Sequence, residues 1–163
     1  MLVNFMSTNI TSLDRAISNT IQWLNDIQDE LGWDSRDKTY QATKAVLQSI
    51  RDRLPIEEVI HLSANLPLVM KGMMMDGYDL KNKPERIRDL EGFLEYVQAN
   101  YDANMRDVIN TEDATVAVIR VLNRRMGGGE MTKVALNMPE KLRRLFTEAG
   151  VEVPETAPMA ATA

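Results

Sequence analysis

Apolar residues recur every three or four positions along most of the chain, which is the spacing of amphipathic helices. The first such stretch begins near Ser12 and ends at Gly32, a residue suited to a helix C-terminal cap. Its apolar stripe consists of Leu13, Ile17, Ile21, Leu24, Ile27 and Leu31. We find no alternating apolar and polar run of the kind that forms a β-sheet. The pattern therefore predicts an all-α protein.

Three more helices are predicted in the first half of the chain. Asp34 and Ser35 offer N-cap oxygens to a second long helix. Pro55 and Pro67 each suit the first residue of a short helix, because the N–H that proline lacks would have no partner there. The helix after Pro67 is rich in methionine, and Gly77 is expected to end it.

The second half of the chain repeats the first. At an offset of 72 positions, Ala42-Thr43 matches Ala114-Thr115, and Asn65-Leu66-Pro67 matches Asn137-Met138-Pro139. The first helices match at an offset of 70. We predict two tandem similar units, each of two longer helices plus a short helical pair, packed as one helical bundle.

The second unit is expected to start with a helix running from Ile87 to Tyr101, followed by a helix capped by Thr111. Gly127 to Gly129 form a joint, Pro139 starts the last helix, and Gly150 ends it. The predicted organisation is a loose arm (1–11), a first helical unit (12–78), a linker (79–86), a second helical unit (87–150) and a disordered tail (151–163).

Composition narrows the possible functions. The 163 residues include no cysteine, one histidine and 11 methionines, with a net charge of −5. The absence of cysteine removes disulfides and thiol chemistry and is compatible with a reducing cytosol. No apolar run approaches the about 20 residues of a membrane span, and the N-terminus does not resemble a signal peptide. We expect a cytoplasmic protein that binds no membrane.

The candidate metal and ligand sites centre on the first unit. Glu58 and His61 have the spacing of a di-iron ligand pair, but such a site needs a second histidine, so we expect no metal or cofactor. We interpret His61 as a half-buried residue that hydrogen-bonds the other unit. Met70, Met73 and Met74 fit a buried stripe, although methionines can also line an adaptable groove. The candidate ligand or partner surface comprises His61, Lys71, Met73, Met75 and Tyr78.

A second candidate site is basic. Residues 114–148 carry seven basic and three acidic side chains, whereas the rest of the chain is acidic. Such a cluster can contact phosphates, or it can pair with the acidic first unit. No aromatic residues interleave with these charges, which argues against nucleic acid. The candidate anion or partner patch comprises Arg120, Arg124, Arg125, Arg143 and Arg144.

The stretch from Tyr40 to Gly72 resembles a known family. It contains Tyr40-Gln-Ala, Arg51-Asp-Arg-Leu-Pro55, His61-Leu-Ser-Ala-Asn-Leu-Pro67 and Lys71-Gly72. With these motifs, residues from about Asp14 to Gly150 resemble the bacterial family catalogued as domain of unknown function 2267. The resemblance implies an all-helical bacterial cytoplasmic protein, and it implies no catalytic residue.

The sequence thus favours a non-catalytic protein-interaction or regulatory module, whose partner is another protein or a second copy. The alternative is a small apolar ligand held in a methionine-lined groove. An enzyme or a carboxylate-rich metal protein is the third possibility. It ranks last because no set of residues in the sequence converges on a reaction.

Overall fold

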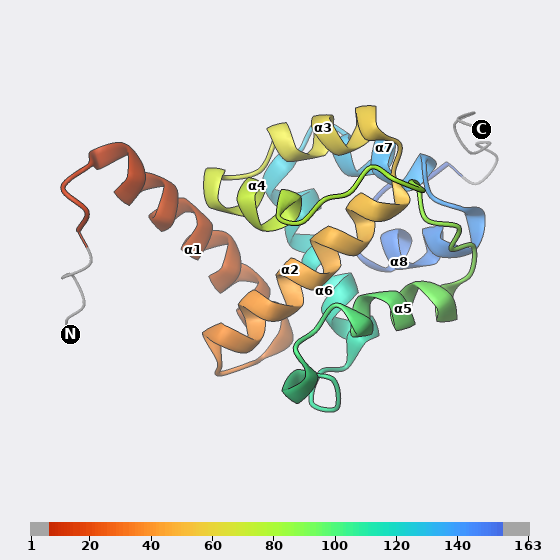
Figure 1. Ribbon diagram of the computed structural model, residues 1–163, viewed down its shortest axis with the longest axis horizontal. Coiled ribbons are helices and arrows are strands. Elements are labelled where there is room, and N and C mark those ends of the chain that lie inside the picture. Colours follow the sequence, from red (N-terminus) through yellow and green to blue (C-terminus); the bar gives the residue numbers. More distant parts are fainter. Residues whose placement is uncertain (1–6, 155–163) are drawn as a thin grey trace.

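Two helices, α2 (Arg36–Arg53) and α6 (Thr111–Met126), lie at the centre of the computed structural model, which describes residues 7–154 (Figure 1). They pack against each other through faces rich in alanine and threonine. The buried Thr43 hydroxyl donates to the carbonyl of Thr39 at 2.7 Å, and the Thr115 hydroxyl donates to the carbonyl of Thr111 at 2.7 Å. These bonds satisfy polar groups that would otherwise be costly in the core.

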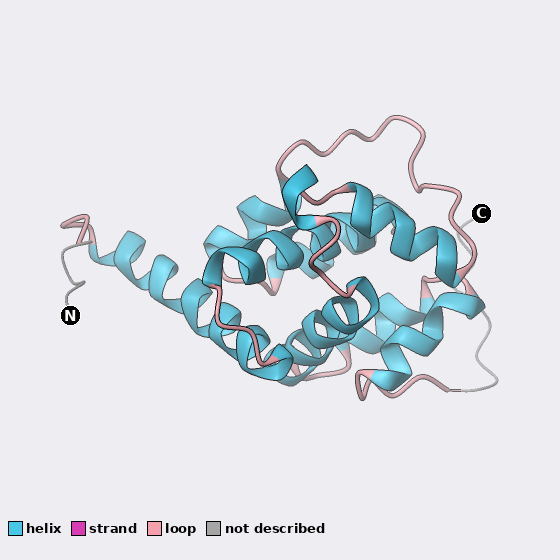
Figure 2. Ribbon diagram, turned by 90° about the horizontal axis from the view of Figure 1, so that it is seen from below, coloured by secondary structure: helices cyan, strands magenta, loops and turns pink. Residues whose placement is uncertain are grey.

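The remaining helices surround this pair. They are α1 (Thr11–Leu31), α3 (Ile56–Ala64), α4 (Leu68–Met75), α5 (Leu90–Ala99), α7 (Glu130–Leu136) and α8 (Arg143–Glu148). Two 3₁₀ turns, Ala103–Met105 and Glu140–Leu142, complete the set. Figure 2 shows helices and loops and no strand over residues 7–154. The predicted all-α class is therefore confirmed.

Helices from the two halves of the chain pack against one another. The first helix, α1, contacts α2, α4 and α6, whereas α5 contacts α2 and α6. Helices α7 and α8 pack on α6, and α3 packs on α4 and α7. One continuous core results, and its largest fully buried side chains are Ile27, Leu47, Ile50, Leu54, Met70, Met74, Phe93, Ile119, Leu122, Met131, Met138 and Phe146.

Several helix ends form as the sequence predicts. Gly32 adopts a left-handed conformation with φ of 65°, and its N–H donates to the carbonyl of Asp29. The Ser35 hydroxyl accepts a hydrogen bond from the N–H of Lys38 at 3.1 Å. Pro55 and Pro67, predicted as the first residues of short helices, instead lie one residue earlier, as the N-caps of α3 and α4. Local chemistry therefore determines these boundaries.

Other predicted boundaries are also wrong. The helix expected from Ile87 begins at Leu90, because the Asp89 carboxylate accepts from the N–H of Gly92 at 2.8 Å and caps it there. The expected cap Thr111 is already the first residue of α6. Asn110 caps this helix instead, with its side-chain oxygen accepting from the N–H of Asp113 at 3.0 Å.

The chain ends are described only in part. Of the predicted arm (1–11), residues 1–6 lie outside the described residues, and Thr11 already belongs to α1. Of the predicted disordered tail (151–163), residues 155–163 lie outside the described residues. Val151 is buried, and the carbonyl of Glu152 accepts from the Thr132 hydroxyl at 2.8 Å, so this tail begins packed on α7.

None of the helices between residues 7 and 154 combines the length and the apolar composition that a membrane crossing requires.

Candidate interaction surfaces and a buried polar network

Three of the predicted basic residues lie on α6 and face acidic residues of α1. Arg120 and Arg124 both bind Glu30, at 3.2 and 3.0 Å. The Arg125 Nε lies 2.8 Å from the Asp26 carboxylate. The hydrogen bond from Arg124 is the main reason that the pKa of Glu30 lies below its usual value. These arginines therefore pair with the acidic first helix, which is one of the two roles considered for them.

The other two residues of the predicted basic patch lie on α8. Arg143 is buried, and its Nη2 donates to the carbonyl of Leu136 at 3.3 Å. Arg144 is exposed and pairs with both Glu112 and Glu148. The five arginines are thus divided between two helices and engaged with protein groups, and they do not form one continuous anion site.

The residues of the predicted ligand or partner surface are separated by burial. Met73 is in the core, together with Met70 and Met74, as the buried-stripe interpretation predicts. Lys71, Met75 and Tyr78 are half-buried. The interpretation of His61 as half-buried is wrong. Its side chain is exposed on α3, because the apolar face of that helix is formed by Val59 and Leu62.

The first part of α1 extends beyond the body of the protein (Figures 1 and 2). We call residues 10–19 the α1 outer half. Every side chain in it is exposed except those of Asp14 and Ala16. The side chain of Asp14 accepts from the N–H and the hydroxyl of Thr8, both at 2.9 Å, and the N–H bond is the first cause of its lowered pKa. These local bonds hold the start of the helix in place.

A second exposed apolar surface lies where α3 meets α4. We call it the α3–α4 corner, and it comprises Ile60, Leu68 and Val69. Helix α4 also packs against α1. The corner is flanked by the exposed His61 and Glu57 and by the half-buried Lys71. Two residues of the predicted partner surface therefore border it.

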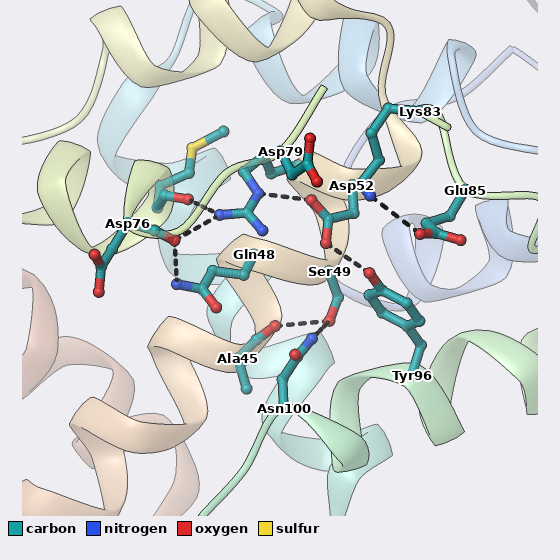
Figure 3. A network of polar contacts seen from close by, with 12 residues as sticks. Ala45, Gln48, Ser49, Asp52, Asp76, Asp79, Lys83, Glu85, Tyr96 and Asn100 are labelled. Carbon is teal, nitrogen blue, oxygen red and sulfur yellow. Dashed lines mark hydrogen bonds and ion pairs between the residues drawn. The ribbon is translucent and has the colours of Figure 1, made fainter. Parts of the chain in front are cut away.

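Sequence reasoning missed a buried polar network on α2, which is drawn in Figure 3. Arg51 and Asp52 are each 5% exposed. The Arg51 Nε donates to the Asp52 carboxylate at 2.7 Å. Its Nη1 donates to the carbonyls of Met74 at 2.7 Å and Asp76 at 3.0 Å. Arg51 therefore binds carbonyls at the C-terminal end of α4, where a cation is favoured by the helix dipole.

Asp52 connects the network to the second half of the chain. Its carboxylate accepts from the Tyr96 hydroxyl at 2.6 Å, and its main-chain carbonyl accepts from the N–H of Glu85 at 2.7 Å. Burial first, and then the bond to this carboxylate, raise the pKa of Tyr96 well above its usual value. The Arg53 Nε donates to the carbonyl of Ile87 at 2.8 Å. The long loop between α4 and α5 is thereby fixed against α2.

The network ties helices and a loop together, and its charges are matched inside the protein. The signal for it was present in the sequence. Arg51 lies four residues after Leu47 and three before Leu54, both in the apolar stripe of α2. A charge at such a position has to be buried with a partner, and the neighbouring Asp52 is that partner.

A cleft at the α1–α6 interface has a volume of about 440 Å³. It is lined by Glu30, Leu31, Asp113, Val116, Ala117, Arg120 and Glu148. Glu30 and Arg120 are engaged with each other. Within residues 7–154, no three or more histidine, aspartate or glutamate side chains are grouped so that they could hold a metal ion.

Most of the chain matches a known protein family. Residues 20–145 match the family described as "uncharacterized conserved protein (DUF2267)". The chain belongs to this family. The DUF2267 match confirms the resemblance seen from Tyr40 to Gly72, and it starts at Thr20, so the α1 outer half lies outside it. The comparison with curated proteins gave no match.

Proposed function

We propose that this DUF2267 protein is a non-catalytic protein-interaction or regulatory module that binds its partner through the α1 outer half. The observation that carries this proposal is the apolar stripe of α1. Leu24 and Ile27 are buried in the body, whereas Leu13 and Ile17, in the same stripe, are each 41% exposed. An isolated helical stretch of this length is marginal in water, so a partner that covers the stripe would stabilise it.

The α1 outer half also lies before the residues that match the family. The DUF2267 match begins at Thr20. By the offset of 70 positions, α5 (Leu90–Ala99) corresponds to residues 20–29 of α1, and the Asp89 that caps α5 corresponds to Asn19. The family match and the counterpart of α1 in the second half therefore both begin at Thr20, and most side chains before it are exposed. An exposed surface outside the matched range is where we expect a function of this chain's own.

We further propose that the scaffold consists of two copies of one unit, at 12–78 and 87–150, joined by a linker at 79–86. Matched local geometry at an offset of 72 residues supports this. The Asn65 side chain donates to the carbonyl of His61 at 2.9 Å, and Asn137 donates to Lys133 at 2.9 Å. Pro67 and Pro139 follow with φ of −56° and −53°.

Side chains that reach across helices are matched as well. Gln48 donates to the carbonyl of Asp76 at 3.2 Å, and Arg120, which lies 72 residues later, donates to the carbonyl of Glu148 at 2.9 Å. In each half, the long central helix therefore binds the end of the short helical pair. The shared positions are scaffold, and function is expected in the positions that differ.

The alternative function, an apolar ligand in a methionine-lined groove, loses its basis because the methionines of α4 fill the core. Met70, Met73 and Met74 are at most 4% exposed. Ligand binding there would require them to leave closely packed positions.

Cross-linking of the full-length protein inside its native cells, followed by mass spectrometry, tests the proposed function. We expect a photoreactive amino acid placed at position 15, in the α1 outer half, to cross-link to another polypeptide chain. The double substitution Leu13→Glu and Ile17→Glu should remove these cross-links, whereas Val108→Glu, at a side chain that is 56% exposed elsewhere, should not. The proposal fails if wild type and the double variant give the same intermolecular cross-links.

A further inference from the structure

Three arginines beside the loop between α4 and α5 have no acidic partner in the described part of the chain. The five arginines of the predicted anion or partner patch are all engaged with other groups of the protein. In contrast, no ion pair within residues 7–154 joins Arg53, Arg86 or Arg88 to a carboxylate. We call these three residues the Arg53 cluster.

The loop presents two members of the cluster on the same side. From residue 82 to residue 88 the even-numbered side chains are exposed, whereas those at 83, 85 and 87 are half-buried. Side chains alternate in this way along an extended segment, so Arg86 and Arg88 both lie on its outer side. Figure 2 shows the loop along the outside of the molecule. Both guanidinium groups are therefore accessible to a ligand in solution.

The third member, Arg53, holds the backbone between the other two. Its Nε donates to the carbonyl of Ile87 at 2.8 Å. The N–H of Glu85 donates to the carbonyl of Asp52 at 2.7 Å. The segment that carries the two loop arginines is thus fixed to the end of α2. A ligand that binds there does not have to order the loop, which lowers the cost of binding.

The positive charge of the cluster is not balanced by neighbouring acids. Burial first, and then the charge of Arg88, lower the pKa of Arg53, whereas a nearby carboxylate would raise it. Two acids of the same segment already have partners. Glu85 pairs with Lys83 at 3.1 Å (Figure 3), and the Asp89 carboxylate caps α5. Like charges held close together favour an anion between them.

The matching arginine in the second half of the chain indicates what such a group binds. Arg125 lies 72 positions after Arg53, and its Nε is 2.8 Å from the Asp26 carboxylate of α1. At the offset of 70 that relates the first helices, Asp26 corresponds to Tyr96 of α5. The phenol of Tyr96 has no negative charge to offer, and it donates to Asp52. In the proposed two-unit scaffold, the first half therefore has the cation of this pair without its anion.

We propose that Arg53, Arg86 and Arg88 bind the phosphate group of a small molecule. Guanidinium groups bind phosphate oxygens through paired N–H bonds, and a phosphate dianion matches several such cations. A long polyanion such as nucleic acid is disfavoured by the net charge of −5 of the whole chain. This site goes beyond the proposed function and does not depend on the α1 outer half.

A cleft beside Arg86 offers room for the rest of the ligand. It is lined by residues 82–86 and has a volume of about 450 Å³. Sites for small molecules have volumes of about 300–1,000 Å³. The amide of Asn82 and the main chain of the loop supply polar groups in this cleft. A phosphorylated molecule could therefore place its phosphate on the arginines and its remaining atoms in the cleft.

Inorganic phosphate is the first probe, added to the full-length protein at neutral pH and constant ionic strength. In NMR spectra it should shift the signals of residues 85–88 and of the Arg53 side chain saturably, with a Kd of about 1 mM. Arg86→Gln and Arg88→Gln should each weaken binding about fivefold, and the double substitution at least about tenfold. Arg15→Gln makes the same change of charge at an exposed arginine of α1 and should leave the Kd unchanged.

Two further probes identify the source of the phosphate group. Glycerol 3-phosphate presents it on a soluble molecule, and phosphatidylcholine vesicles that contain phosphatidic acid present it on a lipid. Binding of the soluble ester that the double substitution weakens assigns the site to soluble ligands. Binding of the vesicles alone, with the same dependence on Arg86 and Arg88, assigns it to a lipid headgroup.

Three results would overturn the proposal. They are equal shifts with sodium chloride at the same ionic strength, an unchanged Kd in the double variant, and binding of a single-stranded oligonucleotide that tightens with its length. The last result would identify a polyanion as the ligand. Because Arg86 and Arg88 are exposed, circular dichroism should show native helicity in their variants. If a variant fails to fold, the wild-type titration with phosphate against chloride still decides.

Discussion

The buried carboxylate of Asp52 gives the sharpest test of how this fold is held together. The substitution Asp52→Ala removes the acceptor of two hydrogen bonds, from Arg51 Nε at 2.7 Å and from the Tyr96 hydroxyl at 2.6 Å. It leaves the Arg51 side chain, which is 6% exposed, without its counter-charge. The stability of the protein should fall, because a buried charge without a partner is more costly than a buried pair.

The size of this loss of stability depends on the hydrogen bonds that Arg51 and Tyr96 keep after the substitution. Breaking a buried ion pair by removing one partner costs about 3–5 kcal/mol. Arg51 keeps its bonds to the carbonyls of Met74 and Asp76, which places the loss near the lower limit. The orphaned Tyr96 hydroxyl adds about 1 kcal/mol. We expect a total loss of about 4 kcal/mol, which corresponds to a fall in Tm of about 10 °C for a protein of this size.

Thermal and urea unfolding followed by circular dichroism measure this loss. Asp79→Ala is the matched control, because that carboxylate is exposed and accepts only from the N–H of Lys81, so its effect should stay within about 0.5 kcal/mol. The double substitution Arg51→Leu and Asp52→Leu should cost less than the sum of the single changes, since it leaves no unpaired charge. A loss below about 1 kcal/mol in Asp52→Ala would refute the assignment of a buried, mutually dependent pair.

Four other predictions concern two glycines and the pH dependence of stability. Gly72→Ala should raise the free energy of unfolding by about 0.5–1 kcal/mol, because Gly72 lies inside α4 and an added Cβ meets nothing within 4 Å. Gly127→Ala should instead lower it by about 1–3 kcal/mol in the same urea assay, because φ of 63° with ψ of −166° strains any other residue. Because the pKa of Tyr96 is raised in the folded protein, its phenol ionises near the usual value of 10.0 only in the unfolded chain. The contribution of Tyr96 to the free energy of unfolding should therefore be fully present below that pH and decline above it. Tyr96→Phe should flatten the decline in an alkaline unfolding series, and an unchanged slope would contradict the role given to this phenol. The lowered pKa of Glu30 makes its contribution present above the usual value of 4.5 and lost as pH falls below it, so Glu30→Gln should reduce the acid sensitivity of Tm.

The predictable part of the fold was the part controlled by local chemistry. The apolar period predicted the helices, and Gly32 and Ser35 capped them where predicted, since these signals act over a few residues. The helical segments after the two Asn-x-Pro joints begin one residue later than predicted. The start of α5 was predicted too early because Ile87 continues the apolar period. Its carbonyl is bound by Arg53, 34 positions earlier in the chain, and no local pattern reports such a contact.

The candidate sites were harder to predict, because periodicity gives the face of a residue but not what lies opposite that face. His61 was expected to be covered, yet nothing packs over its side of α3. The basic residues Arg120, Arg124 and Arg125 could be recognised as a cluster, but only the placement of α1 on α6 shows that Asp26 and Glu30 face them. The exposed half of the α1 stripe was indistinguishable from its buried half in sequence, since both have the same spacing.

The placement of α1 on α6 has a consequence for how the chain reaches its native state. Asp26 and Arg125 are 99 positions apart, and Asp52 reaches Tyr96 across 44. Contacts between residues so far apart in sequence slow folding. The N-terminal helices cannot complete their packing until the C-terminal helices have formed. During synthesis, the first four helices would emerge before α6 exists to cover Ile27. A chain cleaved in the loop between α4 and α5 would therefore give two fragments that acquire stable structure only when mixed.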